Sequence, residues 1–271
     1  MTTTTIPAFP DTTDQRSKLA WAVSDALAIA HRNLIALFRV PTTLVFSTIQ
    51  PVIFVLMFRY VFGGSIQIPG YPHYVDYLMP GIFVQTVTFG SINTGIGLAE
   101  DLSKGLIERF RSLAMARSAV LAGRTIADLV RNLIVIVLMV TVGFLVGFRV
   151  HRNVLALLAA VGLMLLFGFA MSWVMALIGL ATGNAEAAQA ASFPLMAVLV
   201  FASNAFVATR TMPGPLRAYA EHQPITATVN AVRALLNHGA VAEPVLAALA
   251  WSAAIVAVFA PLAVRRYRQT A

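Results

Sequence analysis

Long uncharged stretches, separated by short charged segments, dominate the chain. A helix needs about 20 residues to cross a bilayer, and six stretches approach or exceed that length: Val40–Phe58, Tyr77–Ala99, Asn132–Phe148, Asn153–Ala185, Ala187–Thr209 and Pro244–Val264. The third is short, so we expect it to begin earlier, with Asp128 and Arg131 snorkelling toward a membrane interface. The pattern predicts an all-α integral membrane protein with six transmembrane helices, at residues 40–62, 77–99, 128–148, 153–181, 187–209 and 244–264.

The composition agrees with burial in lipid. Hydrophobic residues make up 59% of the 271 residues and charged residues 11%, whereas soluble domains have about 45–50% and about 25%. So little charge cannot cover a water-soluble protein of this length, and the apolar side chains must therefore face lipid. The absence of cysteine excludes a disulfide framework and a thiolate metal site.

Basic residues are distributed unevenly between the two sides of the predicted bundle. With the N-terminus in the cytoplasm, twelve of the 19 Lys and Arg residues lie inside and five outside, leaving Arg59 and Arg131 at span ends. This bias follows the positive-inside rule and predicts a multi-pass protein of the cytoplasmic (inner or plasma) membrane with both termini cytoplasmic. It also accounts for the net charge of +8 without a nucleic-acid partner.

Besides the direct connections between spans, five segments lie outside the predicted membrane-crossing helices. We expect residues 1–16 to be a disordered N-terminal tail and residues 17–39 to be a cytoplasmic amphipathic interfacial helix, because apolar positions recur there near helical spacing. A cytoplasmic loop, 100–124, an external segment, 210–243, and a cytoplasmic tail, 265–271, complete the chain.

The loop 100–124 contains a short amphipathic pattern. Leu106, Phe110 and Leu113 share one helical face, and Lys104 lies off it. A helix of this kind can dock into a groove on a soluble partner. The alternative is a solvated loop whose positive charge serves only to orient the protein.

Several kinds of chemistry have no support in the sequence. A P-loop ends in Gly-Lys-Ser/Thr, and neither lysine, Lys18 or Lys104, follows a glycine. The five histidines are dispersed, with no metal-ligand spacing and no paired carboxylates. Ion-coupled transporters usually carry ionisable residues within their spans, whereas the six stretches given above contain no charged residue. If the chain moves a solute, a partner is expected to supply the energy.

Polar uncharged side chains gather in the second and fifth predicted spans. The candidates for a substrate pathway are Gln85, Thr86 and Thr88 in the second span and Ser203 and Asn204 in the fifth. Hydrogen bonds between helices are one explanation for such residues. The functional alternative is one wall of a pathway for amphiphilic molecules, and both explanations stay open at this point.

Short motifs in a fixed order point to a family. They are YLMPG at Tyr77–Gly81, Glu100-Asp101, Lys104-Gly105, Glu108-Arg109, Gly123-Arg124, Met212-Pro213-Gly214-Pro215-Leu216, His222-Gln223-Pro224-Ile225-Thr226 and Val232-Arg233. By these motifs, over nearly its whole length, the chain resembles the ABC type-two transporter permeases, and within them the daunorubicin-resistance (DrrB-like) efflux branch.

The resemblance implies partners and cofactors. Members are the transmembrane halves of ATP-driven exporters and work as dimers with two separate ATPase subunits. We therefore expect an ABC ATPase subunit and a second permease chain, either identical or a sister permease, as partners, besides membrane lipids and an amphiphilic substrate. ATP and magnesium belong on the ATPase, so this chain is expected to hold no cofactor and to have no enzyme activity.

The resemblance also implies roles for particular residues. A coupling helix in the loop 100–124 docks on the ATPase, with contacts at Glu100, Asp101, Lys104, Gly105, Glu108 and Arg109. Short external re-entrant helices cap the pathway, with an external gate at Met212, Pro213, Pro224 and Arg233. Members often carry a proline after the coupling helix, but this chain reads Leu113-Ala114-Met115-Ala116-Arg117, so the helix can extend further.

The sequence therefore favours the permease of an exporter for hydrophobic or amphiphilic compounds, such as a drug or a lipid-like metabolite. One alternative is export of a polysaccharide or glycolipid, which would favour aromatic rows along a wide channel. Another is a membrane-embedded enzyme acting on lipids, which would need a carboxylate or histidine cluster at the interface.

Overall fold

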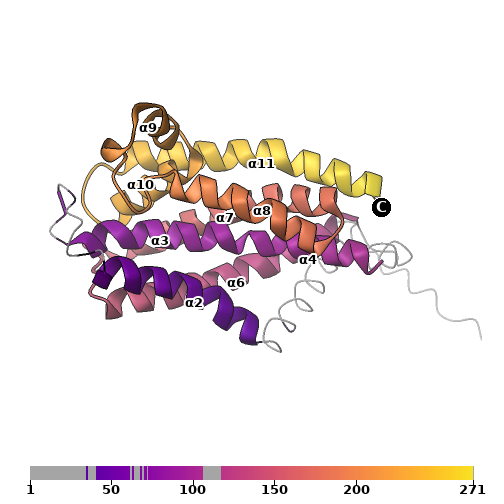
Figure 1. Cartoon of the computed structure of the whole chain (residues 1–271), viewed down its shortest axis with the longest axis horizontal. Coiled ribbons are helices and arrows are strands. Elements are labelled where there is room, and N and C mark those ends of the chain that lie inside the picture. Colours follow the sequence, from indigo (N-terminus) through magenta and orange to yellow (C-terminus); the bar gives the residue numbers. More distant parts are fainter. Residues whose placement is uncertain are drawn as a thin grey trace, which may run out of the picture.

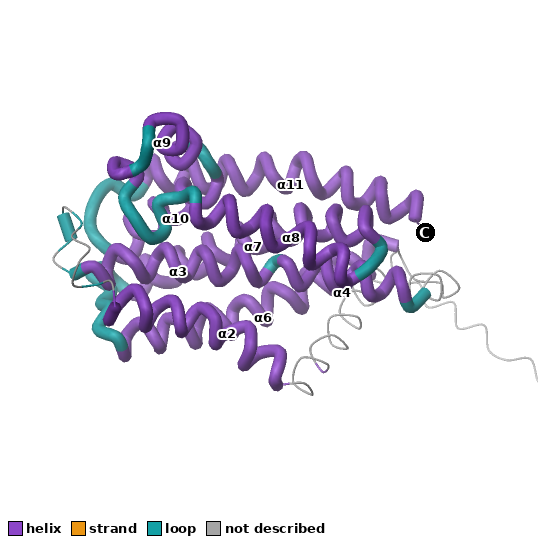
Figure 2. Tube along the Cα trace, in the orientation of Figure 1, coloured by secondary structure: helices purple, strands orange, loops and turns teal. Residues whose placement is uncertain are grey.

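The computed structural model describes residues 41–61, 73–105 and 117–270, together with residues 35, 63, 68, 70 and 71. These residues form helices and connecting turns, with no strand among them (Figures 1 and 2). In chain order the elements are α2 (Pro41–Leu56), η1 (Met57–Val61), α3 (Tyr74–Gly90), α4 (Ile92–Ser103), α6 (Arg117–Leu145), α7 (Val154–Thr182), α8 (Ala185–Phe201), η2 (Thr209–Thr211), α9 (Gly214–Glu221), α10 (Pro224–Leu236) and α11 (Ala242–Thr270). The all-α class is confirmed.

Four helical stretches in the described part of the chain are long and apolar enough to cross a membrane. They are Tyr74–Ser103, Arg124–Leu145, Val154–Thr182 and Ala242–Gln269. Two further apolar stretches, Thr48–Val61 and Ala185–Phe201, are shorter. The chain is thus a helical membrane bundle with four candidate spans, and the count of six stays a prediction.

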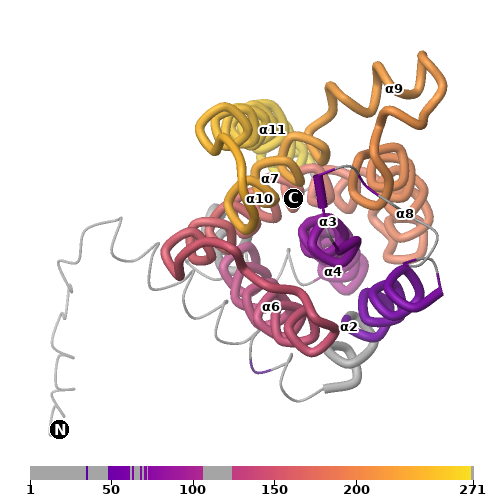
Figure 3. The backbone as a smooth tube through the Cα atoms, turned by 90° about the vertical axis from the view of Figure 1, so that its left-hand side faces the viewer, coloured from indigo at the N-terminus to yellow at the C-terminus, as the bar shows by residue number. Residues whose placement is uncertain are grey.

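The helix α3 occupies the centre of the bundle. It contacts α2, α6, α7, α8 and α10, which surround it (Figure 3). All of its residues from Tyr74 to Thr88 are buried, including the polar Asp76, Gln85, Thr86 and Thr88. Ser91 separates α3 from α4, so the predicted second span is one rod with a break.

Two glycines bring α4 against α7. A Cβ added to Gly179 would lie 2.1 Å from the carbonyl oxygen of Gly95, and one added to Gly95 would lie 2.5 Å from the carbonyl oxygen of Met175. No larger side chain fits between these backbones, and small residues are what such close helix packing requires.

Arg59, whose role the sequence left open, lies in the π-helical turn η1 that follows α2. Its Nε donates a hydrogen bond to the carbonyl oxygen of Val146, 3.4 Å away, just beyond the end of α6. Carbonyls at a helix C-terminus carry a partial negative charge, so Arg59 joins the ends of α2 and α6.

The structure differs from the predicted boundaries at three places. Helix α6 begins at Arg117, inside the predicted loop 100–124 and before the predicted start of the third span at residue 128. The fifth predicted span continues to residue 209, but α8 ends at Phe201 and the backbone of residues 202–206 is not helical. The predicted C-terminal tail instead continues α11, and Tyr267 is buried in one cluster with Leu98 and Leu180.

Other predicted segments lie wholly or mostly outside the residues that the structure describes. The N-terminal tail 1–16, almost all of the interfacial helix 17–39, and residues 106–116 of the coupling loop lie outside the described residues. These predictions therefore stay untested. One end of the bundle contains α9 and is called the α9 end; the other, where α4 and α11 finish, is called the C-terminal end (Figure 1).

Candidate functional site

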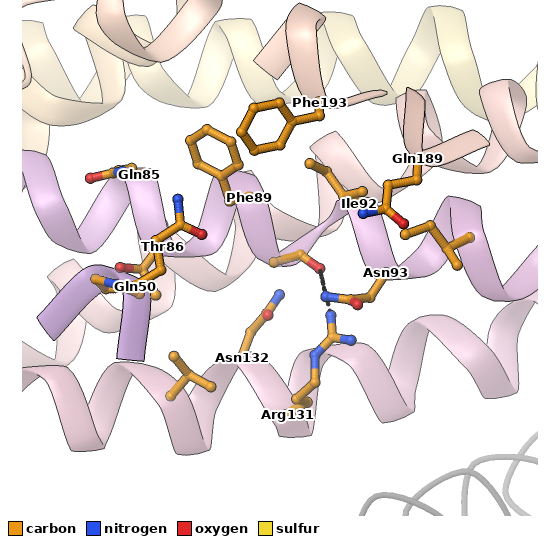
Figure 4. A pocket seen from close by; sticks show the side chains of 14 residues that line it. Gln50, Gln85, Thr86, Phe89, Ile92, Asn93, Arg131, Asn132, Gln189 and Phe193 are labelled. Carbon is orange, nitrogen blue, oxygen red and sulfur yellow. Dashed lines mark hydrogen bonds between the residues drawn. The ribbon is translucent and has the colours of Figure 1, made fainter. Parts of the chain in front are cut away.

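A cavity of about 520 Å³ lies between α2, α3, α4, α6 and α8 (Figure 4). Five amide side chains line it, each from a different helix: Gln50, Gln85, Asn93, Asn132 and Gln189. Phe89 and Phe193 also line it, with ring centroids 5.7 Å apart. A wall that combines uncharged hydrogen-bonding groups with aromatic surface is suited to an amphiphilic ligand. We call this hollow the amide cavity.

The amide cavity is closed on one side and open on the other. Gln85 and Asn132 are buried, whereas Gln50 and Gln189 are exposed. The cavity therefore opens between α2 and α8 and ends against α3 and α6. Within the described part of the chain, the buried Oε1 of Gln85 accepts no hydrogen bond.

Arg131 borders the amide cavity as one half of an ion pair. Its guanidinium lies 3.2 Å from the Asp128 carboxylate and donates a hydrogen bond of 2.6 Å to the carbonyl oxygen of Gly90. Thr94, on α4, donates to the other Asp128 oxygen. The expectation that Asp128 and Arg131 snorkel to an interface was wrong, because their side chains are only 13% and 10% exposed and bond to α3 and α4. The pair thus joins α6 to both sides of the break at Ser91.

The predicted pathway residues fall into three groups. Gln85 and Thr86 line the amide cavity. Thr88 and Ser203 are buried and donate their hydroxyl hydrogens to carbonyls of their own preceding turn, and neither belongs to the cavity wall. Asn204 belongs to a separate cluster around Arg233.

Arg233 is a buried cation at the α9 end. Its Nε donates to the carbonyl oxygen of Tyr77 at 3.0 Å, and one terminal nitrogen donates to the carbonyls of Asn204 and Ala205 at 2.8 and 3.2 Å. Its guanidinium carbon lies 3.6 Å from the centre of the Tyr77 ring, a cation–π contact. Among the described residues no carboxylate pairs with Arg233, so carbonyl dipoles and a ring stabilise its charge.

This cluster supplies donors to the non-helical backbone that follows α8. The hydroxyl of Tyr77 donates to Asn204 and that of Tyr74 to Phe206, at 2.9 and 2.8 Å. Gln223 donates to two carbonyls near the end of α8. Irregular backbone at membrane depth requires such partners. Gly81 permits the close approach, since a Cβ there would lie 2.1 Å from the carbonyl oxygen of Ala205.

The four predicted gate residues differ in burial. Arg233 is buried as described, whereas Met212 and Pro224 are half-buried and Pro213 is exposed. Met212 and Pro213 lie between η2 and α9, and Pro224 is the first residue of α10, where its missing N–H costs no helical hydrogen bond.

Two ion pairs mark the predicted coupling segment at the C-terminal end. Glu100 and Lys104 form an exposed pair at 3.1 Å. Asp101 and Arg124 form a more buried pair at 2.7 Å that joins α4 to α6. A Cβ on Gly97 would lie 1.3 Å from an Arg124 nitrogen, so glycine makes room for this pair.

The remaining coupling positions lie at or beyond the end of α4. Gly105 has a φ of +64°, a backbone conformation that favours glycine and often ends a helix. Glu108 and Arg109 lie outside the described residues. The structure therefore places Glu100, Asp101, Lys104 and Gly105 together at one end of the bundle, and their contact with an ATPase stays a prediction.

Sequence reasoning missed most residues of the amide cavity, among them four polar ones: Gln50, Arg131, Asn132 and Gln189. In the sequence, each of these residues is only a polar position in or beside an otherwise apolar stretch, and nothing there indicates a shared cavity. Because the four come from three different helices, only the packing of the bundle reveals that they converge.

A multi-span helical bundle with a polar cavity at mid-span is typical of a membrane transport protein. Comparison with known proteins narrows the class: residues 25–237 match the ABC-2 type transporter family. The chain belongs to this family, as its motifs had indicated. It is therefore a multi-pass membrane permease and not an enzyme, and its family implies an ABC ATPase partner.

Individual relatives agree with the family assignment. The chain is 35% identical over 254 residues, 94% of its length and 89% of the relative's, to the daunorubicin resistance ABC transporter permease protein DrrB1 of Streptomyces coeruleorubidus. It is 25% identical over 243 residues, 89% of its length and 88% of the relative's, to the probable doxorubicin resistance ABC transporter permease protein DrrC of Mycobacterium tuberculosis. Both names describe permeases of drug-resistance ABC transporters.

Proposed function

We propose that the chain is the permease subunit of an ATP-driven exporter that moves hydrophobic or amphiphilic compounds out across the cytoplasmic membrane. The observation that carries this proposal is the amide cavity, which offers hydrogen bonds and aromatic surface in a bundle of the ABC-2 family. The drug resistance named for the relatives supports drugs or lipid-like metabolites as the substrate class.

Six spans with both termini in the cytoplasm form the proposed topology. Besides the four long helices, α2 and η1 together run from Pro41 to Val61, which is about 31 Å of helix at about 1.5 Å per residue. The stretch from α8 through residue 206 supplies the other span. The buried helix α10, Pro224–Leu236, is too short to cross a bilayer and serves as an external re-entrant helix. The surplus of Lys and Arg sets the orientation.

The transporter is proposed to be a dimer of permeases with two ATPase subunits, which bind ATP and magnesium. The second permease is an identical chain or a sister chain. The coupling contact lies at the C-terminal end of the bundle, in the segment from Glu100 to Arg109. The exposed Glu100–Lys104 pair is available there to a partner, whereas Asp101 is held by Arg124 and acts by fixing the end of α4.

The substrate pathway is proposed to include the amide cavity, with Gln85 and Thr86 in its wall. Ser203, Asn204 and Arg233 instead hold the backbone that closes the α9 end.

Efflux of doxorubicin from cells that make the chain with its cognate ATPase tests this proposal. Glu108→Lys reverses the charge at the coupling contact and is expected to abolish efflux at an unchanged amount of membrane-inserted chain. The control, Glu243→Lys, reverses an exposed charge in the first turn of α11 and should change efflux by less than about twofold.

The outcomes separate the two parts of the proposal. Wild-type efflux by Glu108→Lys would contradict the coupling contact alone. No ATP-dependent efflux by the wild type, with the ATPase shown to copurify, would contradict the exporter itself.

A further inference from the structure

A second hollow lies on the outer surface of the bundle, between α2 and α6. It measures about 380 Å³, and its lining is aliphatic except for Thr48. Ile53 and Leu138, on its two sides, are 55% and 40% exposed. The hollow therefore faces the surroundings of the bundle, which in a membrane are lipid tails. We call it the α2–α6 groove.

The α2–α6 groove and the amide cavity share a wall. Val135, which is only 7% exposed, lines both hollows. One turn before it on α6, Asn132 lines the amide cavity, and one turn after it, Leu138 lines the groove. On α2, Pro51 lines the amide cavity and its neighbour Val52 lines the groove. The two hollows thus lie on either side of one α2–α6 seam, with Val135 between them.

We propose that the α2–α6 groove binds the apolar part of the transported compound, and that the compound passes from the lipid into the amide cavity across this seam at Val135. The inference rests on the proposed transport function and adds a binding site, a route and a substrate class. The compound has an extended apolar portion joined to a hydrogen-bonding portion.

The depth of the seam distinguishes this occupant from a bilayer lipid. Val135 lies near the middle of the span Arg124–Leu145, roughly 15 Å from either end at about 1.5 Å per residue. A lipid keeps its headgroup at the interface, so its acyl chain would fill the groove and leave the amides across the seam unmatched. A compound with both kinds of surface matches both hollows.

On the α2 side of the seam, the helix contains a position where it can bend easily. Pro51 lies inside α2 and has no N–H, so one helical hydrogen bond is missing there and the helix bends more easily. Because Pro51 itself lines the amide cavity, bending at this residue changes the gap between α2 and α6 where the compound would cross.

Binding of radiolabelled doxorubicin to the full chain in lipid nanodiscs tests the inference. Ile53→Trp and Leu138→Trp fill the groove and are expected to raise the Kd by about tenfold or more, because they displace the apolar part of the ligand. The matched control is Val137→Trp. Val137 is 57% exposed on the same helix and lines neither hollow, so its Kd should stay within about twofold. Asn132→Leu, in the amide cavity, should weaken binding without changing the groove.

Each contrary outcome has its own meaning. If Leu138→Trp and Ile53→Trp bind as Val137→Trp does while Asn132→Leu loses affinity, the groove proposal is wrong and the cavity remains the site. If native mass spectrometry finds a phospholipid that Leu138→Trp loses at unchanged doxorubicin affinity, the groove holds a lipid, which also overturns the proposal. If the wild type neither binds nor exports doxorubicin, the proposed function fails and the groove inference fails with it.

A cysteine label keeps the test decisive if a tryptophan variant does not fold. The chain has no cysteine, so bimane on Leu138→Cys or on Val137→Cys is the single label. Doxorubicin is expected to quench bimane strongly at position 138 and weakly at 137. Equal quenching at both positions would contradict occupation of the groove.

Discussion

Arg233 and Arg131 are both buried cations, yet their surroundings differ. Arg233 donates to three backbone carbonyls and packs on the ring of Tyr77. Arg131 pairs with Asp128, bonds one carbonyl and borders the amide cavity.

One buried charge therefore holds backbone in place, whereas the other lies beside the proposed binding site. Around Arg233 several backbone carbonyls accept hydrogen bonds from one side chain, so these contacts can change only together. Arg131 has a carboxylate that balances its charge and open space beside it, so its contacts can rearrange when a ligand enters. Burial alone therefore does not indicate which charged residue borders the proposed transport path.

Replacement of Arg233 should have the largest effect on stability. Arg233→Met removes three charge-assisted hydrogen bonds and leaves the backbone after α8 short of donors, at an expected cost of about 3 kcal/mol in the free energy of unfolding. Thermal unfolding of the purified chain in detergent, followed by tryptophan fluorescence, measures the loss.

The same substitution on the surface provides the control. Arg217 lies 2.7 Å from Glu221 on α9, and its hydrogen bond lowers the pKa of the exposed Glu221 carboxyl, so the pair is charged at neutral pH. Arg217→Met should shift the melting temperature very little, because exposed ion pairs contribute little. Equal shifts for both variants would refute the structural role of Arg233.

Breaking the Arg131 pair should have an intermediate effect. Asp128→Asn keeps an acceptor for Thr94 but leaves the guanidinium without a counter-charge, at a cost of about 2 kcal/mol. The double variant Asp128→Leu, Arg131→Met removes both charges and should recover at least half of the lost stability, as buried pairs often do. If the melting temperature of the double variant is below that of Asp128→Asn, the ion pair stabilises the fold by more than balancing charge. Arg131 would then be a structural residue like Arg233.

The smallest effect on stability is expected inside the amide cavity. Gln85→Leu replaces an amide whose Oε1 accepts no hydrogen bond from described residues, so the free energy of unfolding should change by less than about 1 kcal/mol. Doxorubicin binding should weaken nonetheless, since a polar group of the wall is lost. A large drop in melting temperature with unchanged binding would make Gln85 a structural residue and leave the cavity without its proposed role.

Much of the fold follows from the chain's uncharged stretches, because a bilayer imposes a minimum length on apolar helices. The family followed from short motifs whose meaning the structure explains in part. In YLMPG, Tyr77 supplies a ring, a hydroxyl and a carbonyl to the Arg233 cluster, and Gly81 admits the backbone of Ala205.

The early end of α8 could not be predicted. Nothing in the uncharged run to Thr209 shows that its backbone will find donors on α3 and α10, and Tyr77 is 127 positions from Asn204 in the chain. The convergence of five amides was hidden for the same reason, because each helix contributes one. Periodicity reports which face of a helix is apolar, but it does not report which polar residues of different helices meet.

The central position of α3 limits which amino-acid substitutions the chain can tolerate. Along α3 the residues from Tyr74 to Thr88 are all buried, so every side chain there must fit a protein neighbour in size and shape. In the apolar stretch of α11 only 17% of the residues are buried within the chain. Most positions there need only be hydrophobic enough to face lipid. Substitutions will therefore accumulate quickly in α11 and slowly in α3, and two permeases of this kind can diverge over much of their surface while they keep the same central rod.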